Sequence, residues 1–138
     1  MAYVVGITVA LIVAVFARLT GFDRDRAFYP TVVIVTASFY VLFAVMGGSD
    51  RALIVELMVM TAFVLAAVAA FKLNLWIVVA CLAAHGVFDL FRDLVVTNPG
   101  VPEWWPAFCL TFDVGVAGFL AWLLMRSRLR ARPPLEAG

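Results

Sequence analysis

The stretch Leu73–Val96, LNLWIVVACLAAHGVFDLFRDLVV, decides the fold class, because it is apolar over the length of a membrane span yet contains His85 and Asp89. A helix needs about 20 mainly apolar residues to cross a bilayer. An ionisable side chain at the centre of such a helix costs roughly 2.5–3.5 kcal/mol on insertion scales. The stretch therefore predicts a membrane helix that carries a polar site, which a simple anchor does not need.

The composition of the whole chain also indicates a membrane protein, whose apolar surface is covered by lipid rather than by water. Of its 138 residues, 66% are hydrophobic and 14% are charged, whereas average soluble domains have about 45–50% and about 25%. A chain of this size has too little interior to hide so much apolar surface from water. The net charge of +1 gives no basis for binding nucleic acid.

The apolar runs predict an all-α integral membrane bundle of five transmembrane helices. The expected spans are residues 2–20, 28–47, 52–71, 74–96 and 105–126. Residues 1–126 then form a single membrane domain, and residues 127–138 form a basic, proline-containing tail. The first run has no basic residue before it, unlike a signal peptide, so we expect it to be retained as a span.

The distribution of Lys and Arg predicts the orientation, because basic residues gather on the cytoplasmic side. With five spans the termini lie on opposite sides, and one side then holds eight basic residues and the other two. The eight are Arg18, Arg24, Arg26, Lys72, Arg126, Arg128, Arg130 and Arg132, and the two are Arg51 and Arg92. The N-terminus is therefore expected outside and the C-terminus in the cytoplasm, with a bacterial cytoplasmic (inner) membrane as the location.

Four titratable residues on three of the expected spans form the candidate catalytic set. Glu56, Asp89 and Asp113 lie at similar distances from the outer ends of their helices, about 8–12 Å at 1.5 Å per residue. His85 lies one turn deeper than Asp89. Because carboxylates facing lipid are disfavoured, we expect these helix faces to meet inside the bundle.

Helical spacing predicts some of the partners in this set. His85 and Asp89 are four residues apart, so the carboxylate can hold the imidazole in one tautomer. Arg92 continues the same face and is expected either to neutralise Asp89 or to extend to the outer interface. Asp113 has no cation near it on its own span. Its partner must come from another helix, from water or from a ligand.

The candidate ligand-binding residues surround this set. They are Arg92, Tyr40, Trp104, Trp105 and Asn98. The two tryptophans belong to the segment 97–106, TNPGVPEWWP, which its three prolines stiffen. Aromatic residues of this kind favour the membrane–water interface, so the segment is expected at the outer surface, where it could cap a cavity.

These features support three classes of function. The first is binding of a lipophilic small molecule, or acid–base chemistry on it of the isomerase or cyclase kind. In outline, five short spans with carboxylates and a histidine resemble sterol-isomerase-like membrane proteins, which implies the same chemistry. The second is a proton- or cation-coupled transporter or channel subunit. The third is a non-catalytic accessory subunit of a membrane complex. Whether the protein is an enzyme stays open.

No cofactor and no metal are predicted. The four candidate residues offer one nitrogen and three carboxylates, but there is no second histidine, no HExxH motif and no cysteine cluster. Cys81 and Cys109 lie in separate apolar runs and are expected to be small core residues, with a disulfide between them left open. The expected partners are membrane lipids, a lipophilic ligand, and either further copies of the chain or a membrane-complex subunit.

Overall fold

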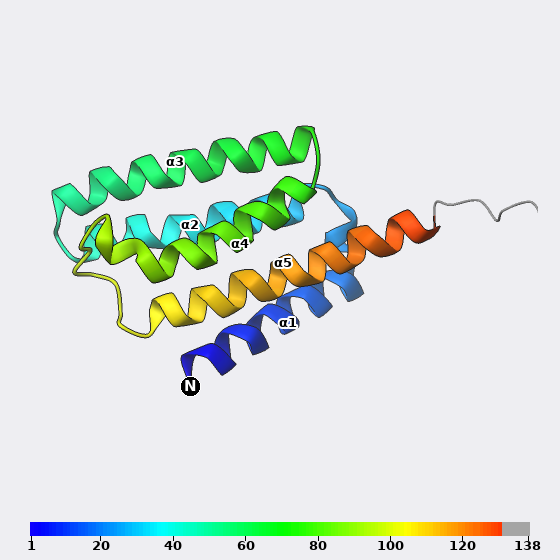
Figure 1. Ribbon diagram of the computed structural model, residues 1–138, viewed down its shortest axis with the longest axis horizontal. Helices are drawn as coiled ribbons and strands as arrows, with labels where there is room; N and C mark the ends of the chain where they lie inside the picture. The colour runs from blue at the N-terminus through cyan, green and yellow to red at the C-terminus, as the bar shows by residue number, and fades with distance from the viewer. Residues whose placement is uncertain (131–138) are drawn as a thin grey trace, which may run out of the picture.

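The computed structural model describes residues 1–130, and this range is all-helical (Figure 1). The helices are α1 (Ala2–Thr20), η1 (Phe22–Arg24), α2 (Phe28–Met46), α3 (Asp50–Lys72), α4 (Trp76–Phe91), η2 (Arg92–Leu94) and α5 (Trp105–Arg130). Those labelled η are single turns of 3-10 helix. The predicted all-α bundle of five helices is thereby confirmed.

Within residues 1–130, four helices are long and apolar enough to cross a membrane: α1, α2, α3 and α5. Many of their large apolar side chains face outward, as they do in helices that are surrounded by lipid. The protein is therefore a membrane protein. Helix α4 has 16 residues, which gives about 24 Å at 1.5 Å per residue, less than the roughly 30 Å of a hydrocarbon core.

Helix α4 is shorter than the predicted span 74–96, because the chain leaves the α-helical path at Arg92. There the Arg92 side chain turns into the bundle, and the backbone continues as η2. Val96 then packs against Ala44 of α2 and Ala52 of α3. The segment that follows α4 is thus folded onto the neighbouring helices rather than extended away from them.

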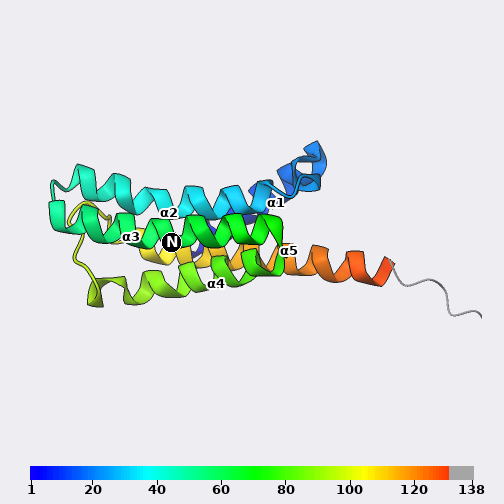
Figure 2. The ribbon, with the colours of Figure 1, turned by 90° about the horizontal axis from the view of Figure 1, so that it is seen from above.

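Helix α5 packs against α1 and α4, and α3 packs against α2 and α4 (Figures 1 and 2). Glycines set the closest of these contacts. A Cβ on Gly6 would meet the Phe108 carbonyl, and one on Gly115 would meet Ile7 and Ala10. Although η1 links them, α1 and α2 do not pack closely along their lengths. Helix α2 therefore stands apart from the tight α1–α5 pair.

The two ends of the bundle differ in charge. One end holds η1, the turn between α3 and α4, and the last turns of α5, which extend past the other helices (Figure 1). Basic residues gather there, including Arg18, Arg24 and Lys72. Helix α5 continues to Arg130, beyond the predicted end at 126. The rest of the predicted tail, residues 131–138, lies outside the described residues.

Candidate functional site

The centre of the site is a hydrogen bond between α4 and α5. His85 Nδ1 lies 2.7 Å from Asp113 Oδ2, and both side chains are fully buried. Gly86 permits this approach, because a Cβ there would lie 3.2 Å from the Leu110 carbonyl oxygen. Of the three sources considered for the partner of Asp113, another helix supplies it, because His85 belongs to α4. With Asp113 ionised, Nδ1 carries the proton and donates it, which leaves Nε2 as the basic nitrogen.

Asp89 completes a three-residue cluster but is not hydrogen-bonded. Its Oδ2 lies 3.8 Å from His85 Nδ1, beyond hydrogen-bonding distance. Neither carboxylate oxygen makes a hydrogen bond of standard geometry among residues 1–127, although the Tyr40 hydroxyl and the Cys109 thiol lie close enough to act on the carboxylate as donors. The Tyr40 hydroxyl is unpartnered there as well. Because buried polar groups are normally paired, these atoms mark a place that a polar group of a ligand or a water molecule would fill.

The same three residues could hold a divalent cation. One ligand atom from each of His85, Asp89 and Asp113 lies within 4.8 Å of the others. One nitrogen and two carboxylates are suitable ligands for such an ion and would leave a coordination position open. In the described arrangement, however, Nδ1 and Asp113 are joined directly by their hydrogen bond. This hydrogen bond suits proton transfer at the imidazole and needs no rearrangement of the side chains, whereas binding of a metal ion at Nδ1 would have to break it.

Two aromatic rings hold the imidazole in place. The Phe63 ring from α3 meets it edge-on, with centroids 4.9 Å apart, and the Tyr40 ring from α2 lies 5.9 Å away. The sequence did not single out Phe63. A signal was present, because Phe63 follows Glu56 by seven residues and so shares its helix face.

Glu56 lies in a second buried group rather than in the His–Asp cluster. Arg92 donates a hydrogen bond of 3.1 Å to Glu56 Oε1, and Asn98 donates one of 3.2 Å to the same oxygen. Asn98 also donates to the Tyr40 carbonyl. Arg92 therefore pairs with Glu56, not with the carboxylate one turn before it on α4. Its other ion pair is with Asp93, which is exposed.

The Tyr40 ring contacts both groups. Arg92 Cζ lies 4.8 Å from the centroid of this ring, and the His85 ring centroid lies 5.9 Å from it. Of the four predicted catalytic residues, three meet directly, whereas Glu56 belongs to the group around Arg92. Among the predicted ligand-binding residues, Tyr40 adjoins the cluster, and Arg92 and Asn98 belong to the second group.

The two predicted tryptophans take different positions. Trp105 is half-buried and packs on Phe39 and Phe43 of α2, with centroids 5.0 and 4.9 Å away. Trp104 is exposed and contacts Trp105. Gly100 fits against the Phe43 carbonyl with no room for a side chain. The segment between α4 and α5 is thus held on the end of α2.

An apolar groove of about 450 Å³ lies where α2 stands apart from the α1–α5 pair. Its walls include Val9, Val13, Val35, Phe39, Phe108 and Phe112. The most deeply buried residues that line it are Thr36 and Cys109. Because Cys109 also neighbours Asp89, the groove reaches the edge of the His–Asp cluster.

Fold and site together define a small helical membrane protein with a buried His–Asp cluster beside an apolar groove. Comparison with protein-family models, with curated proteins and with solved structures gave no match to this chain. The outline resemblance to sterol-isomerase-like membrane proteins gains no support from these comparisons. The function must therefore be inferred from the chemistry of the site.

Proposed function

We propose that this protein binds a lipophilic small molecule in the groove beside α2 and performs acid–base chemistry on it at His85, Asp89 and Asp113. One observation carries the proposal: the apolar groove reaches Cys109, whose neighbour Asp89 has a buried carboxylate that makes no hydrogen bond of standard geometry among residues 1–127. The groove walls fit an apolar body, and the carboxyl group fits a polar or unsaturated centre at its end.

The site supplies both groups that a double-bond isomerisation requires. An acid protonates one carbon of an alkene, and a base removes a proton from a carbon beside the cation, so the double bond moves and no proton is lost overall. Asp89 in its carboxylic acid form is the acid in this scheme, and Nε2 of His85 is the base. Transfer of the proton gained by Nε2 to the Asp89 carboxylate, through a water molecule that enters once the product has left, restores the starting state.

Transport of protons or cations is supported less well by the packing. Polar groups lead from Asn98 through the Glu56–Arg92 pair to His85. Next to the cluster, toward the basic end, the described core contains a layer of buried apolar side chains. It includes Val33, Val78, Leu82 and Val116. Ion and proton pathways need polar or hydrated residues across the whole membrane.

A role as an accessory subunit would call for polar groups on outward faces, where a partner helix could bind them. His85, Asp89 and Asp113 are instead buried inside this chain, which favours a small ligand over a partner helix. We further propose that the protein lies in a bacterial cytoplasmic membrane with its N-terminus outside. The gathering of basic residues at one end of the bundle supports this orientation.

The binding step can be tested by mass spectrometry of lipophiles retained after gentle detergent extraction. Val35→Trp would fill the groove, because Val35 lines it on α2. Val45→Trp is the matched control, since Val45 is an exposed valine of the same helix that does not line the groove. We expect the wild type and V45W to retain the same lipophile and V35W to lose it. Equal retention by V35W, or no retained lipophile in the wild type, would contradict the proposal.

The chemical step is tested separately with Asp89→Asn. This variant keeps the shape of the side chain but removes the acid. It is expected to retain the lipophile in an unreacted form that differs from the wild-type species in double-bond position. Identical bound species in both proteins would leave binding intact and refute the acid–base step.

A further inference from the structure

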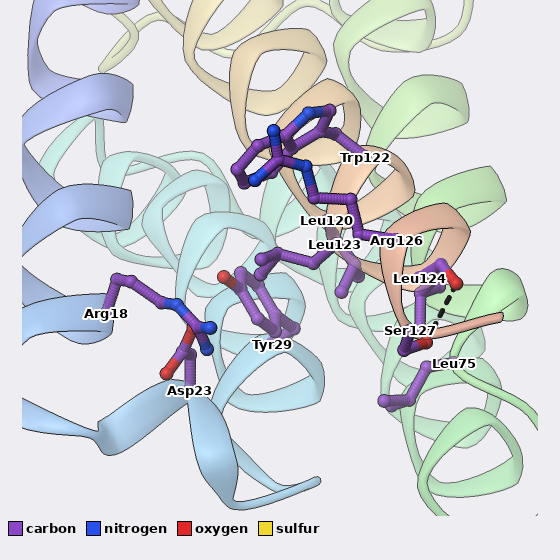
Figure 3. A pocket seen from close by; sticks show the side chains of 10 residues that line it. All are labelled: Arg18, Asp23, Tyr29, Leu75, Leu120, Trp122, Leu123, Leu124, Arg126 and Ser127. Atoms are coloured by element: carbon purple, nitrogen blue, oxygen red, sulfur yellow. Dashed lines mark hydrogen bonds and ion pairs between the residues drawn. The ribbon is translucent and has the colours of Figure 1, made fainter. Parts of the chain in front are cut away.

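A second cavity, of about 260 Å³, lies at the basic end of the bundle, away from the His–Asp cluster (Figure 3). The last turn of α1, η1, the start of α2 and the last turns of α5 form its polar walls. Four polar residues from these elements line it: Arg18, Asp23, Tyr29 and Arg126. The proposed function uses none of them.

The charges that line this cavity are not balanced. Arg18 is paired with Asp23 across 3.3 Å. Arg126 stacks on the Trp122 ring, 4.2 Å from its centroid, and makes no ion pair within the described part of the chain. Two guanidinium groups and one carboxylate leave one net positive charge. A phosphodiester carries one negative charge and is a preferred partner of arginine.

Two buried oxygens in the same cavity lack hydrogen-bond partners among the side chains that the structure describes, those of residues 1–127. They are Asp23 Oδ1 and the Tyr29 hydroxyl, and both side chains are at most 2% exposed. Figure 3 shows the Tyr29 hydroxyl between Arg18 and the leucines of α5. A carboxylate oxygen can only accept a hydrogen bond, so a ligand that satisfies it carries a donor. Hydroxyl groups next to the phosphate would satisfy both oxygens.

The remaining walls are apolar and indicate where the rest of the ligand lies. Leu75, Leu120, Leu123 and Leu124 line the cavity beside its polar groups. The cavity also lies at the ends of membrane-crossing helices, where lipid headgroups meet acyl chains. A soluble phosphodiester would leave the leucines without a partner, whereas a phospholipid covers them.

We infer that this cavity binds an anionic phospholipid whose headgroup carries hydroxyl groups, with the phosphate on Arg126 and the hydroxyls on Asp23 and Tyr29. Phosphatidylglycerol has this chemistry. Phosphatidylmethanol has the same charge without the hydroxyls, and phosphatidylcholine has neither the net charge nor a donor. Three such lipids with identical dioleoyl chains therefore separate the contributions of charge and of hydrogen bonding.

The experiment is a titration of the delipidated full-length protein with each lipid in mild detergent, followed by native mass spectrometry. We expect one tightly bound phosphatidylglycerol per chain, weaker phosphatidylmethanol and weakest phosphatidylcholine. Arg126→Gln should lower affinity for both anionic lipids by about tenfold, as for one lost charge-assisted hydrogen bond. Tyr29→Phe should lower only the affinity for phosphatidylglycerol, by about two- to tenfold for a neutral hydrogen bond.

Arg51→Gln is the matched control, because Arg51 is an exposed arginine at the start of α3, at the opposite end of the bundle. It should bind all three lipids like the wild type. The inference is overturned if R126Q and R51Q behave alike, or if phosphatidylcholine binds as tightly as phosphatidylglycerol. It is also overturned if soluble glycerophosphoglycerol matches the lipid, since the cavity would then recognise a free phosphodiester. Unchanged helix content by circular dichroism shows that each variant is folded.

Discussion

The buried carboxylates of this protein are compensated to different degrees. Glu56 accepts hydrogen bonds from Arg92 and Asn98, so its charge is matched by a full guanidinium charge and a further donor. Asp113 accepts one from His85. Asp89 makes no hydrogen bond of standard geometry among residues 1–127, and its neighbours His85, Tyr40 and Cys109 compensate it less closely. Because an unpaired buried charge is costly, this order identifies Asp89 as the residue kept for a purpose other than stability.

This difference predicts opposite effects of two isosteric substitutions on stability. Asp113→Asn weakens the hydrogen bond from His85 and should lower the free energy of unfolding by about 1.5–3 kcal/mol, the usual range for a hydrogen bond to a charged group. Asp89→Asn removes the less closely compensated carboxylate and should leave stability unchanged or raise it. Thermal unfolding in detergent measures both. A larger loss for D89N than for D113N would show that Asp89 is a structural residue.

Helix α4 decides the geometry of the site at the scale of single elements. It carries His85 and Asp89, and its early end at Phe91 lets Arg92 turn inward toward Glu56. The contact with α5 at Gly86 fixes the distance between the imidazole and Asp113.

A pair of glycine substitutions tests this contact. Gly86→Ala places a Cβ 3.2 Å from the Leu110 carbonyl oxygen, and such overpacking is expected to cost about 1–3 kcal/mol. Gly118→Ala on α5 meets nothing within 4 Å, and it should have no cost or stabilise the helix by up to about 1 kcal/mol. Thermal unfolding of both variants is the measurement. Equal stability of G86A and G118A would mean that α4 can move away from α5 at this position without a loss of stability.

The whole molecule consists of a tight α1–α5 pair, the α2–α3 pair, and α4 between them. This division creates the groove beside α2, because α2 has no close helix neighbour on that side. It also separates the ends of the bundle, with basic residues gathered at the end where α1, α3 and α5 finish. The orientation of the bundle in the membrane remains a prediction from these charges.

Cysteine labelling tests that orientation. Ser49→Cys lies in the turn before α3, and Ser127→Cys lies near the end of α5, so they mark opposite ends. In intact cells, a membrane-impermeant maleimide should label the first and not the second. The wild type is the control for background, since Cys109 is buried and Cys81 is half-buried. Labelling of position 127 alone would reverse the predicted orientation.

The sequence predicted which residues belong to the candidate site better than it predicted the contacts between them. His85, Asp89 and Asp113 were identified because each is an ionisable residue in an apolar run, which a single chain segment reveals. The pairing of Arg92 with Glu56 could not be read in the same way, since it depends on the rotation of α4 relative to α3. The role of Phe63 beside the imidazole depends on that same rotation.

The sequence by itself determined that the chain is an all-helical membrane protein of five helices with ionisable groups inside them, because span length and the cost of a charge in lipid are local properties. Only the tertiary structure decided which groups meet and where the groove lies. In a membrane protein the outward and inward faces are both apolar, so periodicity does not reveal which face of a helix meets its neighbour. Close contacts at residues such as Gly6, Gly86 and Gly115 settle that choice, and they exist only once the helices have packed.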